Sequence, residues 1–382
     1  MDRHELNRMF DGLTPDPQRE RELLNQLLQD GARRKTPMKN WKRVVLAVAA
    51  AALLVTGAAA AVVPGISQKL LEYLGVAPED TQAAELLVSG AMALDITKED
   101  NGATLHVTQV LRDRTSIMVL VDFTAPEGTV LKMTPDSEKV LEGSKGFYGT
   151  DEWLYFMDEA GEKTDLGIYG NYIYDWEIME DGDPLDNHVS AMFTIKLPQG
   201  GILHGKAASM RLPVGTLMRL DWDADKEKPL FADVYSGDWS CDVPLPQKDI
   251  GWTQQVDCPV GELDGADIMV KELYLSPVNL LITLGREGGT AFSEGGADLD
   301  EEARWVCLLD VKAVTLKDKD GNVIAMGAPN FGSGSIGNTE STNMFRLAEI
   351  TDPAEFQGGS ITLDLRCGAV TIPLDDLHPV DP

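Results

Sequence analysis

The chain has 382 residues, with 62 acidic against 33 basic side chains and a formal net charge of −29. This balance excludes the basic phosphate-binding face of a nucleic-acid-binding protein, and five histidines with four cysteines leave little material for a metal cluster or cofactor site. The apolar content of 43%, with 36 glycines and 20 prolines, predicts folded, turn-rich structure rather than disorder.

Residues 1–43 predict a short cytoplasmic segment of two helices with apolar stripes. The first stripe repeats at the spacing of one helix face, and Asp16 before Pro17 marks the start of a second helix that ends near Gly31. The stripes consist of Leu6, Met9, Phe10, Leu13, Leu23, Leu24, Leu27 and Leu28. Helices this short bury too little surface to fold alone, so we expect them either to pack as a hairpin that dimerises or to dock on a partner protein. The alternative is an amphipathic segment that rests on anionic lipid.

Residues 44–63 predict a transmembrane helix. Twenty residues without a charge rise about 30 Å as a helix, which matches the hydrocarbon core of a bilayer. Six cations precede this span: Arg33, Arg34, Lys35, Lys39, Lys42 and Arg43. Because positive flanks stay in the cytoplasm, we expect a cytoplasmic N-terminus and an extracellular C-terminal bulk. The alternatives are a buried globular helix, favoured by the many alanines of the span, and a signal peptide cleaved near residues 58–61.

Beyond the span the pattern is mainly β. Residues 64–99 are expected to form a juxtamembrane connector with a short helix at 68–74, and from about residue 101 the alternation of apolar and polar residues is typical of strands. The predicted strands are 104–111, 116–123, 192–197, 209–212, 268–275, 280–284, 305–314, 323–326 and 361–365.

The β part of the sequence contains an internal repeat. Residues 101–110 align with residues 264–273 at an offset of 163, and each copy is followed by a turn and a second apolar strand. Residues 158–161 and 318–321 predict hairpin turns at nearly the same offset. We therefore expect two tandem β-sandwich (Ig-like) extracytoplasmic domains. The predicted boundaries are 100–222 for the first β domain, 223–262 for a linker and 263–382 for the second β domain.

One stretch resembles a known family. Residues 100–111 read DNGATLHVTQVL and lead to FTAPEGTV at 123–130, and over roughly residues 38–135 this arrangement resembles the DUF4179 family of Gram-positive membrane proteins. The resemblance implies a layout like that of membrane-anchored anti-sigma regulators, with a cytoplasmic segment, one span and an external sensor. The inner segment departs from the zinc-containing anti-sigma pattern, since it has one histidine, His4, and no cysteine.

Four cysteines follow the predicted span and are candidates for disulfides: Cys241, Cys258, Cys307 and Cys367. The pairings 241–258 and 307–367 are the simplest of three arrangements. The anaerobic host that the resemblance implies would favour free buried thiols, so both states stay open.

No motif predicts an enzyme. Residues 332–337 match G-x-G-x-x-G, but a polar run follows instead of a helix, so we interpret the match as a turn. The acidic runs at 221–225 and 318–322 lack the correctly placed glycine of a calcium loop, and we interpret them as turn carboxylates. The histidines are scattered, without a neighbouring nucleophile or metal-ligand spacing.

Together these patterns predict a single-pass cell-membrane regulator that resembles an anti-sigma factor. Its cytoplasmic helices would hold a sigma factor, and its external β region would bind an unknown extracellular ligand. The alternative is a cell-surface binding or adhesion protein whose N-terminal segment is only an anchor.

Overall fold

The computed structural model describes residues 65–77, 80–133, 146–147, 154–164, 173–179, 185–197, 207–223, 228–263, 266–288, 311–324, 326–329, 334–336, 340–365 and 367–380. The predicted cytoplasmic segment 1–43 and the predicted span 44–63 lie outside these residues. Within the described part, no helix has the length and apolar character needed to cross a membrane. The described chain is mainly β and forms several antiparallel sheets, which confirms the predicted class at this level.

Two short helices open the described chain. Helix α4 (Gln68–Tyr73) begins after Ser67, whose hydroxyl accepts a hydrogen bond from a backbone N–H of the first turn. Helix α5 (Thr81–Val88) begins after Asp80, whose carboxylate does the same. Helices of this length are marginal alone, so packing against the neighbouring sheet stabilises them. The predicted helix at 68–74 is confirmed.

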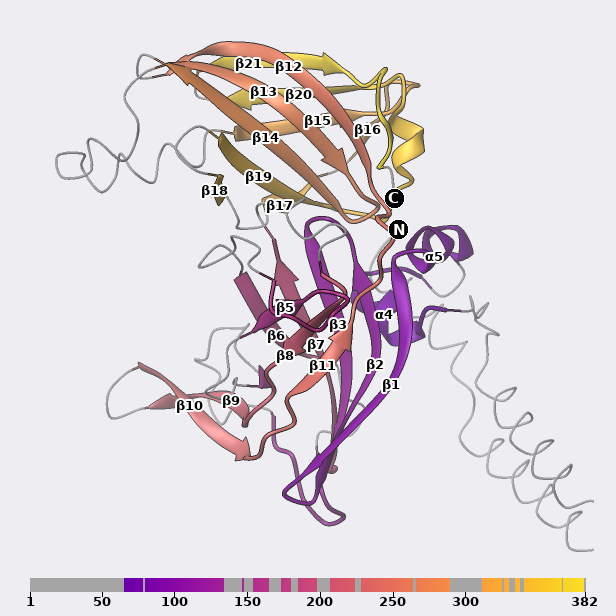
Figure 1. The fold of residues 1–382 in the computed structure, drawn as a ribbon, viewed down its shortest axis with the longest axis vertical. Coiled ribbons are helices and arrows are strands. Elements are labelled where there is room, and N and C mark those ends of the chain that lie inside the picture. The colour runs from indigo at the N-terminus through magenta and orange to yellow at the C-terminus, as the bar shows by residue number, and fades with distance from the viewer. Residues whose placement is uncertain are drawn as a thin grey trace, which may run out of the picture. The chain divides into compact units, whose positions relative to one another are not determined.

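A five-stranded antiparallel sheet follows (Figure 1). Its strands are β1 (Ala91–Asp100), β2 (Ala103–Arg112), β3 (Ser116–Thr124), β6 (Ile173–Ile178) and β7 (His188–Lys196). They run in the order β1-β2-β3-β7-β6. Strand β3 is buried on both faces because the core covers one face and helices α4 and α5 cover part of the other, which we call the outer face. This double burial explains its nearly continuous apolar sequence.

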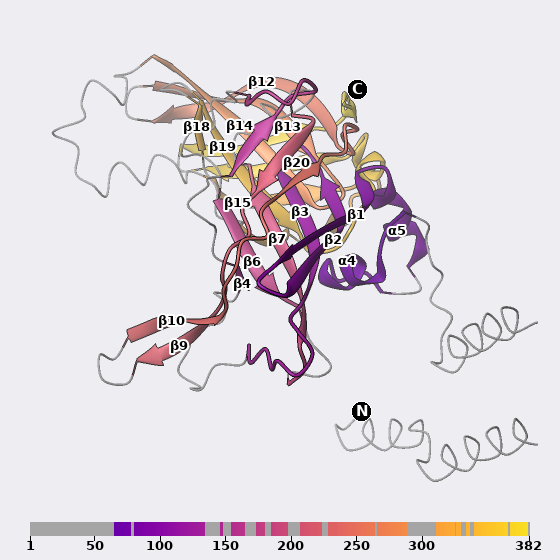
Figure 2. The same cartoon turned by 60° about the horizontal axis from the view of Figure 1, so that its bottom comes forward.

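Two small sheets close the other side of this core. Strands β5 (Tyr155–Met157), β8 (Ser209–Leu212) and β11 (Cys241–Pro244) form one, in the order β11-β8-β5. Strands β4 (Gly146–Phe147), β9 (Leu217–Asp223) and β10 (Lys228–Tyr235) form the other, in the order β10-β9-β4. The β9–β10 hairpin extends away from the five-stranded sheet (Figure 2). We call residues 91–244 the first region.

The second region, residues 252–380, also contains two sheets. The larger has the order β17-β19-β14-β13-β12-β22, and β18 also pairs with β19; its strands are β12 (Trp252–Leu263), β13 (Ala266–Leu275), β14 (Asn279–Gly288), β17 (Met326–Pro329), β18 (Gly334–Ile336), β19 (Glu340–Leu347) and β22 (His378–Pro379). The smaller has the order β16-β15-β20-β21, with strands β15 (Val311–Lys317), β16 (Val323–Ile324), β20 (Ser360–Leu365) and β21 (Gly368–Pro373). The short 3-10 helix η1 (Pro353–Phe356) precedes β20. Apolar side chains from both sheets form one core.

Two of the predicted boundaries differ from the structure. Strand β1 lies inside the range 64–99 that was expected to be a connector; Met92, Leu94 and Ile96 alternate and pack against the core, but most of the other side chains of the strand are exposed. The range 223–262, expected to be a linker, contains β10, β11 and most of β12. Its prolines are compatible with strands, since Pro244 ends β11 and Pro259 lies at an irregularity of β12.

The pairing of β2 with β3 and the pairing of β13 with β14 have the same register irregularity, 163 residues apart. Strand β2 pairs with β3 through Val107–Val121 and then shifts by one residue after Thr108. Strand β13 pairs with β14 through Val270–Leu284 and shifts in the same way after Lys271. A β-bulge adds one unpaired residue at a defined place, so its recurrence at the same offset confirms the internal similarity for these strands.

The predicted hairpin turns are also confirmed as one repeated structure. Asp158 and Asp318 each accept two backbone N–H bonds of 2.8–2.9 Å within their own turn. Gly161 and Gly321 adopt φ angles of 79° and 84°, which favour glycine.

Replacing one core leucine tests the second core. Leu363 is fully buried, so Leu363→Ala should lower the free energy of unfolding by about 2–5 kcal/mol. Leu230, a strand residue that is 46% exposed, is the matched control, and Leu230→Ala should change it by less than about 1 kcal/mol. Urea denaturation of the full chain measures both. Equal losses would contradict the assignment of the core.

Candidate functional site

A buried hydrogen-bond network joins the two regions. Asp113, in the β2–β3 turn, is only 3% exposed. One carboxylate oxygen accepts four hydrogen bonds of 2.7–3.1 Å from backbone and hydroxyl groups of Thr115 and Ser116. The other accepts one from the Ser276 hydroxyl at 2.6 Å and one from the Asn279 amide at 3.0 Å. A buried carboxylate is stable only when it is well hydrogen-bonded, so this group fixes both turns together.

A second set of contacts extends the network. The Arg114 guanidinium forms a bidentate pair with Glu272, with N–O distances of 2.6 and 3.3 Å. The Tyr274 hydroxyl accepts the Arg114 N–H at 3.0 Å and donates to Asp249 at 2.6 Å. Burial raises the pKa of Tyr274 well above its usual value, and the carboxylates of Asp113 and Asp249 raise it further. The phenol therefore remains a neutral donor at physiological pH.

Helices α4 and α5 and the residues before them contact the five-stranded sheet and the second region. The Gln109 side chain, 2% exposed, donates to the Gly65 carbonyl at 2.7 Å and accepts the Ser67 N–H at 2.7 Å. Apolar residues of α4 and α5 pack on the outer face of the five-stranded sheet and against Val278 of the second region. The segment that enters the described structure is thus attached to both regions.

An ion pair joins helix α4 to strand β3 of the five-stranded sheet. The Lys69 ammonium lies 2.7 Å from Asp122, and the Ser190 hydroxyl donates to the same carboxylate at 2.6 Å. Burial alone would raise the pKa of Asp122, but the bonds from Lys69 and Ser190, with the charge of His188, hold it below its ordinary value.

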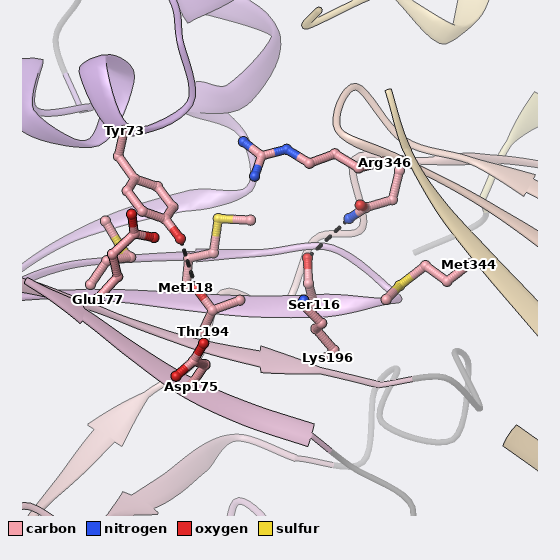
Figure 3. A pocket seen from close by; sticks show the side chains of 11 residues that line it. Tyr73, Ser116, Met118, Asp175, Glu177, Thr194, Lys196, Met344 and Arg346 are labelled. Atoms are coloured by element: carbon pink, nitrogen blue, oxygen red, sulfur yellow. Dashed lines mark hydrogen bonds between the residues drawn. The ribbon is translucent and has the colours of Figure 1, made fainter. Parts of the chain in front are cut away.

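A cleft of about 180 Å³ lies beside these contacts (Figure 3). Its apolar lining comes from the buried Met118, Met192 and Met344, which belong to β3, β7 and β19. Helix α4 contributes Tyr73, whose hydroxyl lies 3.4 Å from the hydroxyl of Thr194. The cleft therefore has walls from the connector and from both regions.

The charged side chains of the cleft form two poles. Asp175 and Glu177 lie two residues apart on the edge strand β6. Lys196 pairs with Ser116 in one sheet, and Arg346 pairs with Asn279 in the other. The Asn279 amide donates to the Ser116 hydroxyl at 3.1 Å. Both cations therefore lie next to this contact between the two regions, which we call the junction. Figure 3 shows the Arg346 guanidinium extending toward Tyr73. Among the described residues, no acidic side chain lies within ion-pair distance of Lys196 or Arg346, but the charge of Lys196 acts on Asp175 from further away.

The acidic pole has perturbed electrostatics. Partial desolvation raises the pKa of Asp175 and outweighs the backbone N–H bond and the charge of Lys196, while Glu177 raises it further. Burial raises the pKa of Tyr73, and Glu177 adds to the rise. Perturbed pKa values cluster at functional sites, and this cleft contains two such groups.

None of the site residues predicted from sequence is among the described residues that line this cleft. The docking stripes from Leu6 to Leu28 and the cations from Arg33 to Arg43 lie outside the described residues, as does Cys307. Cys241 is a buried free thiol and Cys258 a half-buried one, so of the two states left open for this pair the structure has the free thiols. Burial raises the pKa of the Cys241 thiol to about 11.

The G-x-G-x-x-G match does not form a nucleotide loop. Its described residues form β18, and the next described element is strand β19 rather than a helix. In the described part of the chain, no cluster of histidine, cysteine and acidic side chains could hold a metal ion.

Sequence reasoning missed the cleft. Asp175, Glu177 and Lys196 come from the consecutive strands β6 and β7, whereas Arg346 comes from β19, and neither β6 nor β19 was predicted as a strand. The one available signal was the internal repeat, because the turns that bring these strands together are equivalent positions of the two copies.

The ion pair of α4 predicts a pH effect. Because the folded-state pKa of Asp122 is lowered, its contribution is present above the unfolded value of about 3.9 and is lost as the pH falls through the folded value. Lys69→Met should cost less than about 1 kcal/mol at pH 7, since Lys69 is 46% exposed, and should flatten the loss of stability as the pH falls below about 4. Urea denaturation across this range measures the effect, with exposed Lys248→Met as control. Parallel curves for Lys69→Met and the wild type would contradict it.

Comparison with known proteins adds little to this description. No family model matches the sequence, and no curated protein matches it. Among solved structures, the crystal structure of the conserved domain protein from Bacillus anthracis is similar at 14% identity and a TM-score of 0.39, covering 75% of this chain and 92% of that chain. A similarity at this level carries no argument about fold or function.

Proposed function

We propose that the chain is a single-pass membrane regulator that resembles an anti-sigma factor. Its two β regions act as tandem Ig-like sandwiches outside the cell, and its cytoplasmic helices hold a sigma factor. The protein acts by binding rather than by catalysis, and the cleft beside α4 is the place where the external signal is received.

The attachment of the connector carries this proposal. Residues 65–77 follow the predicted span directly, and α4 is fastened by Gln109 and by the Lys69–Asp122 pair. Tyr73 of the same helix lines the cleft. A ligand that moves Tyr73 would therefore move the segment that leads to the membrane, and an anchor alone needs no such coupling.

The alternative is a surface-binding or adhesion protein. The β9–β10 hairpin, with Leu230 and Phe231 each 46% exposed, is the feature that favours it. Two scattered apolar residues are ordinary on a protein surface, so this observation is weaker than the coupling of α4 to the cleft.

Substitution of the second cytoplasmic stripe tests the proposal. Leu24→Asp with Leu27→Asp should release the sigma factor, because each leucine contributes about 1.5–3 kcal/mol when buried in a partner's groove. Co-purification of sigma factor with the full chain, measured by mass spectrometry, should fall about a hundredfold or more.

The matched control adds the same charge to the polar side of that helix. Asn25→Asp with Gln29→Asp should leave co-purification near the wild-type level. If no sigma factor accompanies the wild-type chain, or if the leucine variant retains it, the assignment as an anti-sigma regulator is wrong.

A further inference from the structure

We propose that the cleft binds a small zwitterion of dipeptide size, with its ammonium at Asp175 and Glu177 and its carboxylate at Lys196 and Arg346. This inference deepens the proposed function and rests on it only in taking the cleft as the signal-receiving site. Binding itself is measured independently of any sigma factor.

The arrangement of charge selects this class of ligand. The cleft holds two acids and two cations, so a simple anion would meet Asp175 and Glu177, and a simple cation would meet Lys196 and Arg346. A molecule with one charge of each sign satisfies both poles. Lys196 and Arg346 present charge-assisted donors to a carboxylate from the lining of the cleft.

The backbone spacing of the charged residues and the volume of the cleft indicate the size of the ligand. Asp175 pairs with Thr194, two residues from Lys196 on the same face, and the Cα atoms of such diagonal neighbours in a sheet lie about 7–8 Å apart. An extended dipeptide spans about 7 Å, whereas the two charges of a free amino acid are much closer together. The volume of about 180 Å³ is also below the roughly 300–1,000 Å³ of pockets for drug-sized ligands.

The apolar lining and Tyr73 complete the site. Met118, Met192 and Met344 offer adaptable apolar contacts for small side chains. The Tyr73 hydroxyl interacts with Thr194 and Glu177, and its oxygen can also accept a hydrogen bond from the peptide N–H. A ligand held in this way bridges α4, β6 and β19.

Calorimetric titration of the full-length protein in detergent micelles tests the inference. L-alanyl-L-alanine is the probe, and its N-acetylated, C-amidated form and free L-alanine are the comparison ligands. We expect the dipeptide to bind, and the blocked form and free alanine to bind at least about tenfold more weakly. Arg346→Gln should weaken dipeptide binding about tenfold to hundredfold, because a charge-assisted bond is lost. Arg211→Gln, on β8 in another sheet, is the matched control and should leave it unchanged.

Each outcome decides one claim. Absence of dipeptide binding, equal binding of the blocked form, or an Arg346→Gln variant with wild-type affinity would overturn the ligand assignment. Free alanine binding as tightly as the dipeptide would overturn the assigned size. Dipeptide binding that leaves sigma-factor co-purification unchanged would support the ligand assignment and count against the proposed function.

Discussion

The buried carboxylate of Asp113 is the contact on which the arrangement of the two regions depends. It accepts hydrogen bonds from its own turn and from the equivalent turn of the second copy, at Ser276, which is 163 residues further along the chain. Equivalent surfaces that meet each other resemble the self-complementary interface of a two-fold dimer. In a fully symmetric contact two aspartates would face and repel each other. Serine at position 276 removes that repulsion, because its hydroxyl donates where a second carboxylate could only accept.

The two copies use one position of the fold for different purposes. Gln109 and Glu272 both follow the repeated bulge, and both point away from their own core. Gln109 binds the connector at Gly65, whereas Glu272 pairs with Arg114 of the first region. Because the residue at this position differs between the two copies, the first sheet binds the segment that leads into α4, and the second sheet binds Arg114 of the first region. The cleft takes its charged side chains from strands β6, β7 and β19, which the contact between the two turns brings together.

The sequence allowed the local elements to be predicted better than their assembly. Strands with an apolar face, such as β2, β3, β13 and β20, were predicted, as were helix α4 and both aspartate hairpin turns, since each depends on residues close in the chain. Strand β1 was missed because it is largely exposed. The cleft could not be predicted, because Lys196 and Arg346 are ordinary charged residues until the Asn279–Ser116 bond places their strands together.

Differential scanning calorimetry of the full chain and of Asp113→Asn tests most directly whether the junction makes the two regions one unit. Asparagine presents an N–H where the structure requires an acceptor, and breaking a buried charged network costs about 3–5 kcal/mol. The wild type should unfold the two regions in one transition, and Asp113→Asn should separate them into two. Asp318→Asn, in an exposed turn that uses its aspartate in the same way, should keep the single transition. A single, unshifted transition in Asp113→Asn would contradict the account.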